Sequence, residues 1–180
     1  GAATTDVMFD EVRIPVANIV GGMARWNDAW ELVIGPGLNV EKLEVAAMAL
    51  GIAGAAIDDA WQYANERAQF GKSICAYQSI QHKLADMTTQ FHAAQLMVYH
   101  AADALDRKDP QATKLCAMAK RFATDGGFEI ANQALQLHGG YGYLRDYPVE
   151  RIVRDLRVHQ ILEGTNEVMR VIISRELLRQ

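Results

Sequence analysis

Apolar residues recur at alternating intervals of three and four along most of this chain, which is the spacing of one face of an α-helix. In the first such stretch, from about Leu38 to Gly71, this stripe comprises Leu43, Ala47, Leu50, Gly54, Ile57, Trp61 and Ala64. In the second, from about Gln78, it comprises Ile80, Leu84, Met87, Phe91, Ala94, Val98, Ala101 and Leu105. In the third it comprises Leu115, Ala119, Phe122, Gly126, Ile130, Ala134 and Leu137. The pattern predicts three long helices, each with one face turned toward a shared core.

Capping residues, prolines and glycines mark the ends of the predicted helices. Asp109 can cap the third helix and Pro110 can open it, because a first-turn residue needs no N–H for the helix ladder. Gly139–Gly140 ends this helix, and a shorter fourth helix follows Pro148. A last amphipathic helix runs from Asn166 to Leu178. Seams of this kind favour an antiparallel up-down helical bundle, so the predicted fold class is all-α.

One segment near the N-terminus has the character of a strand instead. Asp6–Ile14 (DVMFDEVRI) is predicted to be one short strand, which ends where Pro15 removes a ladder donor. A lone strand is not stable by itself, so we expect it to lie against the helices or to fray. Between it and the first long helix, Trp26–Ile34 is expected to form a helical turn or two before Gly35–Gly37 interrupts it.

Composition narrows the class of protein. With 180 residues, half of them hydrophobic and 22% charged, the chain is typical of one globular domain with a single sizeable core. A net charge of −4 argues against nucleic acid as a partner, and no apolar run approaches the ~20 residues of a membrane span. Cys75 and Cys116 lack paired spacing and no Glu-x-x-His pair occurs, so we predict no metal site.

The spacing of helix-breaking and capping residues near the C-terminus indicates Glu163 as a candidate catalytic residue. Gly164 interrupts the helical pattern and Thr165 can cap the next helix, so Glu163 is expected on a bend just before a helix N-terminus. Such a bend can present a carboxylate to a cleft. The alternative is an ordinary acidic residue favoured by the helix macrodipole, and the spacing alone favours this plainer role.

Three segments of the chain resemble one known family. Residues 138–170 read HGGYGYLRDYPVERIVRDLRVHQILEGTNEVMR and closely resemble the C-terminal signature of the acyl-CoA dehydrogenases, the FAD enzymes of fatty-acyl and amino-acid catabolism. Residues 49–87 (ALGIAGAAIDDAWQYANERAQFGKSICAYQSIQHKLADM) and residues 8–22 (MFDEVRIPVANIVGG) resemble earlier parts of the same family. The resemblance implies that residues 1–22 are the terminal strand and linker of a missing middle β-domain. Residues 23–180 would then be the C-terminal helical bundle domain.

The resemblance also implies where FAD is bound. Matched residue by residue, Arg67, Gln69, Phe70 and Gln78 would reach the adenosine-pyrophosphate end of an FAD that is held mainly by the neighbouring subunit. Gln136 and Gly140 would line another part of the pyrophosphate site, and Thr165 and Glu167 would turn toward the cofactor. From the residues alone, a solvated arginine at a helix end and spare glycines at a helix stop are the plainer interpretations.

The same matching yields two alternative catalytic bases. Glu163 matches the glutamate with which most family members take the α-proton of an acyl-CoA, and its backbone N–H would stabilise the thioester oxygen. Glu41 matches the base of a minority of members. Lys42 and Gly164 would contact the substrate, although Lys42 stands where the family usually has an arginine, and lysine lacks the bidentate fork.

The resemblance implies α,β-dehydrogenation of an acyl-CoA, with electrons passing to an electron-transferring flavoprotein. It further implies a homotetramer or homodimer, a cytoplasmic location in a bacterium or the mitochondrial matrix in a eukaryote, and an inactive isolated fragment. Alternatives are an acyl-CoA oxidase, an enoyl-CoA reductase of the same fold, or a non-catalytic relative used for assembly.

Overall fold

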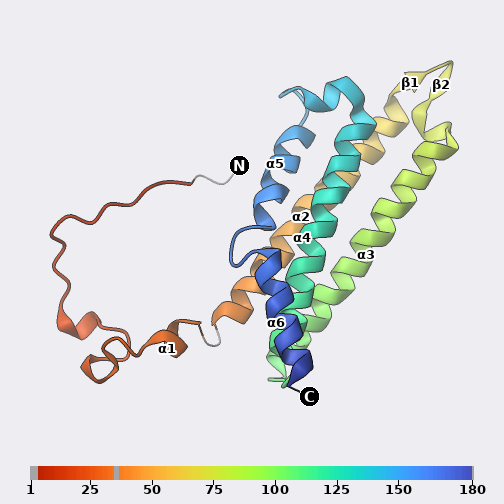
Figure 1. Ribbon diagram of the computed structural model, residues 1–180. Helices are drawn as coiled ribbons and strands as arrows, with labels where there is room; N and C mark the ends of the chain where they lie inside the picture. Colours follow the sequence, from red (N-terminus) through yellow and green to blue (C-terminus); the bar gives the residue numbers. More distant parts are fainter. Residues whose placement is uncertain (1–3, 35–36, 180) are drawn as a thin grey trace.

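The structure is a computed structural model that describes residues 4–34 and 37–179 (Figure 1). Its main helices are α1 (Trp30–Ile34), α2 (Gly37–Glu66), α3 (Gln78–Asp106), α4 (Ala112–His138), α5 (Val149–His159) and α6 (Asn166–Leu178). The other elements are the strands β1 (Ala68–Gln69) and β2 (Lys72–Ser73) and the 3₁₀ turns Val16–Asn18, Met23–Arg25, Ile74–Ala76 and Gly139–Tyr143. The predicted all-α class and the five predicted helices are confirmed.

α4 is the central helix of the bundle, and α2 and α3 pack along it (Figure 1). α2 and α4 run in the same direction, since Asn39 Nδ2 donates to Thr113 Oγ1 at 3.0 Å at their starts and the Tyr63 and His138 rings stack at 4.2 Å near their ends. α3 runs opposite to both, and α5 returns along α4, as an up-down bundle requires. Gly127 permits the close approach of α2, because a Cβ there would lie 3.4 Å from the Ala49 carbonyl oxygen.

The predicted apolar stripes match the buried faces to different degrees. The stripes of α3 and α4 are largely buried, apart from a partly exposed Phe122. The stripe predicted for α2 is only one edge of its buried face, since Ala47 is exposed and Trp61 is 57% exposed. The buried face of α2 is instead a run of alanines: Ala46, Ala49, Ala53, Ala56, Ala60 and Ala64. Small side chains let α4 pack closely, so the larger residues of α2 lie at its border with α3.

The predicted strand at Asp6–Ile14 is wrong. Residues 4–15 form neither helix nor strand and are exposed, and Glu11 adopts a left-handed φ of 45° that interrupts the extended run. No sheet lies beside this segment in the described part of the chain, so its backbone has no ladder to join. The turn predicted near Trp26–Ile34 is confirmed as α1, while the division of the chain at residue 22 stays a prediction.

A small hairpin that the sequence did not predict follows α2. Ala68 pairs with Ser73 and Gln69 with Lys72, and the two turn residues, Phe70 and Gly71, have φ values of 51° and 83°. Positive φ at both positions is the conformation of a tight type I′ turn. The hairpin carries the chain from the end of α2 to the start of α3 (Figure 1). No helix in the described residues is long and apolar enough to span a membrane.

Candidate functional site

The bend between α5 and α6 places Glu163 in an uncommon backbone conformation. Glu163 has a φ of 52° and Gly164 a φ of 89°, so two successive residues are left-handed. For a residue other than glycine this conformation costs about 1 kcal/mol or more and persists only where its surroundings hold it. The Asn166 N–H closes the bend by donating to the Gln160 carbonyl at 3.0 Å. The predicted bend before a helix N-terminus is confirmed.

A buried lysine on α4 anchors this bend. Lys120 is 0% exposed, and its Nζ donates to the Gly164 carbonyl at 2.8 Å and to Asn166 Oδ1 at 2.9 Å. Asn166 Nδ2 donates to Thr124 Oγ1 at 2.9 Å and to Asp125 Oδ1 at 2.7 Å. The bend and the start of α6 are therefore fixed to the central helix by a connected set of polar side chains.

Burial sets the protonation chemistry of this lysine. Desolvation lowers the pKa of Lys120 from 10.5 to about 8, and the nearby carboxylates of Asp125, Glu167 and Glu163 oppose that lowering. The negative charges around Lys120 therefore keep the pKa of its ammonium from falling further.

Neither the carboxylate nor the backbone N–H of Glu163 has a hydrogen-bond partner in the described part of the chain. Its side chain is exposed, and within the described part of the chain its carboxylate makes no hydrogen bond or ion pair. Its backbone N–H likewise donates to no acceptor there. The carboxylate and the backbone N–H of Glu163 are therefore both available to a ligand. They lie beside the Gly164 carbonyl, which Lys120 holds in place.

Thr165 and Glu167, predicted to contact the cofactor, here serve the first turn of α6. Thr165 Oγ1 caps the helix by accepting from the Val168 N–H at 3.3 Å. The backbone N–H of Glu167, followed by the Thr165 hydroxyl, lowers the pKa of the Glu167 carboxyl. Glu167 also accepts from Arg170 at 3.2 Å.

The alternative base lies on the first turns of α2. Glu41 is half-buried, and the neighbouring Lys42 is only 5% exposed. Lys42 Nζ donates to the Leu38 carbonyl at 2.8 Å and to Asn39 Oδ1 at 3.3 Å, and burial lowers its pKa. In this structure the Lys42 ammonium is occupied within its own helix, so its contact with a substrate stays a prediction.

A second group of predicted residues meets in a cavity of about 490 Å³ at the other end of the bundle. Arg67 and Gln69, just after α2, line it together with Gly140, just after α4. The Arg67 guanidinium carbon lies 5.3 Å from the centroid of the Tyr141 ring, which orients this cation. A Cβ at Gly140 would meet no atom within 4 Å, so the backbone there is open to a ligand.

Three further residues predicted to contact the outer part of the FAD do not line this cavity. Phe70 is 93% exposed at the hairpin turn, Gln78 is the exposed first residue of α3, and Gln136 is exposed near the end of α4. The hairpin itself is fixed, because the Tyr77 hydroxyl donates to the Gln69 carbonyl at 2.9 Å.

The structure does not bring the two groups of residues together within one chain. Lys120, which anchors the Glu163 bend, and His138, which lines the cavity, are five turns apart on α4, or roughly 27 Å at 1.5 Å per residue. A ligand bound in the cavity of one chain is therefore remote from the Glu163 bend of that chain.

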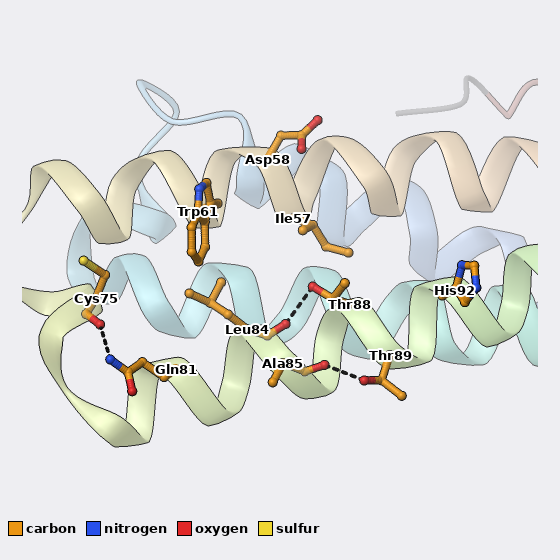
Figure 2. Close-up of a pocket in the computed structure, with 10 residues that line it drawn as sticks. All are labelled: Ile57, Asp58, Trp61, Cys75, Gln81, Leu84, Ala85, Thr88, Thr89 and His92. Carbon is orange, nitrogen blue, oxygen red and sulfur yellow. Dashed lines mark hydrogen bonds between the residues drawn. The ribbon is translucent and has the colours of Figure 1, made fainter.

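A larger hollow of about 930 Å³ lies between α2 and α3 and contains none of the predicted site residues (Figure 2). It is mostly apolar, with Ile57, Trp61 and Leu84 facing into it. Its hydroxyl groups are satisfied within α3, since Thr88 and Thr89 each donate at 2.8 Å to a carbonyl one turn earlier. We assign no chemistry to this groove. Within the described ranges, no cluster of three or more His, Cys, Asp or Glu could hold a metal ion.

Comparison with known proteins identifies the family. The family described as "Acyl-CoA dehydrogenase, C-terminal domain" matches residues 27–178. The chain belongs to the acyl-CoA dehydrogenase family. It is 49% identical to the mitochondrial isobutyryl-CoA dehydrogenase of Bos taurus, over 98% of this chain and 42% of that protein. It is 42% identical to subunit CarC of the caffeyl-CoA reductase-Etf complex of Acetobacterium woodii, over 100% of this chain and 46% of that protein.

The fold agrees with this family assignment. The solved structure of butyryl-CoA dehydrogenase from Megasphaera elsdenii matches with a TM-score of 0.77 and 46% identity, over 79% of this chain and 37% of that chain. This acyl-CoA dehydrogenase domain spans less than half the length of the curated relatives it matches. The family is one of flavoprotein oxidoreductases, as the sequence resemblance implied.

Sequence reasoning missed the residues that hold the Glu163 bend. Lys120 and Thr124 lie in AMAKRFATD, where a lysine falls on the alanine-rich buried face of a helix. A charged residue at such a position needs a buried partner, and that signal could have directed attention to Asn166, the first residue of α6.

Proposed function

We propose that the full-length protein is an FAD-dependent acyl-CoA dehydrogenase, in which Glu163 takes the α-proton of an acyl-CoA thioester. The observation that carries this proposal is the left-handed bend, which leaves the Glu163 carboxylate and backbone N–H without protein partners. Membership of the family supports the reaction class.

Glu163 supplies two groups that the reaction needs. The α-hydrogen of a thioester is too weakly acidic for a free carboxylate near neutral pH, so the site must also stabilise negative charge on the carbonyl oxygen. The Glu163 N–H is a fixed donor for that oxygen while the carboxylate accepts the α-proton. Gly164 and Lys42 would contact the thioester and the CoA. Exclusion of water by the bound acyl chain strengthens these interactions.

The residues around the second cavity fit the outer part of an FAD. Arg67 offers a cation and a planar fork for a phosphate, Gly140 leaves open space above the backbone, and Gln69 adds an amide. Phe70 and Gln136 are sequence neighbours of residues that line this cavity, and together with Gln78 they would extend the contact. When bound, the flavin supplies the acceptor for the β-hydride.

The distance between the two groups of residues supports a shared site across subunits. Because the cavity and the Glu163 bend lie far apart on α4, each would contact a different copy of the cofactor. Thr165 and Glu167 at the bend would then face one FAD, while Arg67 would reach the FAD of a neighbouring subunit. We therefore propose a homo-oligomer, a dimer or a tetramer, as the active form, with an electron-transferring flavoprotein as its oxidant.

A reductase running the same chemistry in reverse is the second candidate. It is favoured by the similarity to the subunit of a caffeyl-CoA reductase-Etf complex. In that direction a protonated Glu163 would donate the α-proton.

The test uses the full-length flavoprotein. Anaerobic mixing of the oxidised protein with saturated acyl-CoAs of varied chain length is expected to bleach the flavin absorbance within the turnover time. If no saturated acyl-CoA reduces the flavin, while the reduced protein transfers electrons to enoyl-CoAs, the direction is that of a reductase. If neither happens, the proposal is wrong.

A further inference from the structure

The buried cluster beside the Glu163 bend has no role in the reaction described so far. The side chains of Lys120 and Thr124 are 0% exposed and that of Asn166 is 3% exposed. Burying an ammonium costs free energy, and replacing a buried charge by an apolar side chain of similar volume is often neutral or stabilising. Stability of the bundle alone therefore does not account for a lysine at this position.

The contacts of the cluster all run from the rigid central helix to the bend. Lys120 Nζ fixes the Gly164 carbonyl at 2.8 Å, which is the carbonyl of the residue directly after Glu163. The same ammonium donates to Asn166 Oδ1 at 2.9 Å. The Thr124 hydroxyl accepts from Asn166 Nδ2 at 2.9 Å and donates to the Lys120 carbonyl at 2.9 Å. Three side chains thus determine where the peptide after Glu163 lies.

We propose that Lys120 is a positioning residue for the Glu163 base, and that Thr124 and Asn166 fix the position of Lys120 relative to the bend. This inference rests on the proposed function, because Lys120 acts on the reaction only through Glu163. The left-handed φ of Glu163 is strained for a residue with a Cβ, so a bend without its anchor relaxes toward more favourable conformations. A misplacement of the base by about 1 Å is enough to slow a reaction by roughly 10²-fold.

The test measures proton removal by itself, in the full-length FAD-loaded enzyme. The probe is a β,β-dimethyl-substituted acyl-CoA, which has α-hydrogens but no β-hydrogen to transfer. In D₂O the enzyme exchanges the α-hydrogens for deuterium, and mass spectrometry follows the rate. We expect Lys120→Met to slow exchange about 10–100-fold while the Kd for the probe stays within about twofold. A merely structural role would not separate exchange from binding.

Lys83→Met is the matched control. Lys83 is a partly buried lysine on α3 that donates to Gln133 on α4, and it touches neither the bend nor the residues assigned to binding. Its loss removes one ammonium and one hydrogen bond between helices, whereas Lys120→Met removes one ammonium and two hydrogen bonds, both to the bend and the start of α6. We expect the wild-type exchange rate. An equal slowing in both lysine variants would overturn the proposal.

Thr124 offers a second pair of variants if Lys120→Met does not fold. Thr124→Val removes the hydroxyl and keeps the shape, whereas Thr124→Ser keeps the hydroxyl and loses a buried methyl group. We expect slowed exchange in the valine variant and near wild-type exchange in the serine variant. If the two Thr124 variants exchange the probe at the same rate, whether that rate is fast or slow, the proposal is contradicted.

The outcomes also separate this inference from the proposed function. If the wild-type enzyme does not exchange the probe, or if Glu163→Gln exchanges it at the wild-type rate, the proposed function is wrong and this inference falls with it. If exchange depends on Glu163 but proceeds normally in Lys120→Met, only the positioning role is overturned.

Discussion

Gly164→Ala is the substitution that most sharply perturbs the Glu163 bend. The φ of 89° at Gly164 lies in the region that L-residues rarely adopt, which costs an alanine roughly 1–2 kcal/mol. A Cβ there would also lie 2.8 Å from Met169 Cε, and Met169 is almost completely buried. The methionine end can move, but only within a packed site, at a cost of about 1–2 kcal/mol. We therefore expect a loss of roughly 2–4 kcal/mol.

Gly71→Ala isolates the conformational part of this loss. Gly71 also has a positive φ, of 83°, but a Cβ there would meet no atom within 4 Å. In urea titrations of the full-length protein, the free energy of unfolding should therefore fall by about 1–2 kcal/mol for Gly71→Ala and by clearly more for Gly164→Ala. The reasoning would be refuted if Gly164→Ala cost no more than Gly71→Ala. Flavin reduction should also slow in Gly164→Ala, because the residue after the base is displaced.

Three further predictions address burial, the cofactor and helix propensity. Since burial lowers the pKa of Lys120 to about 8, folding penalises its charged form below that pH and the penalty is relieved as pH rises toward 10.5. The stability of the wild type relative to Lys120→Met should thus rise by up to roughly 3 kcal/mol between pH 7 and 10, and a flat difference in urea midpoints would contradict this. Arg67→Ala should weaken FAD binding about tenfold in an apoprotein titration, because a phosphate contact is lost; an unchanged Kd would be incompatible with the cavity as the cofactor site. Gly51→Ala in the middle of α2, where a Cβ meets nothing within 4 Å, should stabilise the protein by about 0.5–1 kcal/mol, and a lower unfolding midpoint would count against it.

The helical skeleton was predictable because its signals are local. Pro110, Gly139 and Thr165 stand at helix ends where caps and breakers act within one turn, and the predicted boundaries agree with the structure to within a few residues. The face of α2 was less predictable. On α2, the stripe that includes Trp61 is more hydrophobic than the stripe of alanines. The alanine stripe is nevertheless the buried one, because α4 packs too closely against α2 for larger side chains.

The candidate site also has one part that local sequence predicts and another that it does not. The bend at Glu163 follows from Gly164 and Thr165, which are adjacent in the sequence. The contact between Lys120 and Gly164 joins residues 44 positions apart, and no local spacing indicates it. The strand predicted at Asp6–Ile14 failed for the opposite reason: its pattern is local, but a strand exists only through pairing with another.

The central claim is that Glu163, rather than Glu41, is the catalytic base. The direct measurement is the rate of anaerobic flavin reduction by an acyl-CoA in full-length Glu163→Gln and Glu41→Gln, each first shown to carry a full complement of flavin. Glu163→Gln should reduce its flavin about 10²–10⁴-fold more slowly while still binding the acyl-CoA, and Glu41→Gln should stay near the wild-type rate. Abolished reduction in Glu41→Gln together with normal reduction in Glu163→Gln would contradict the account.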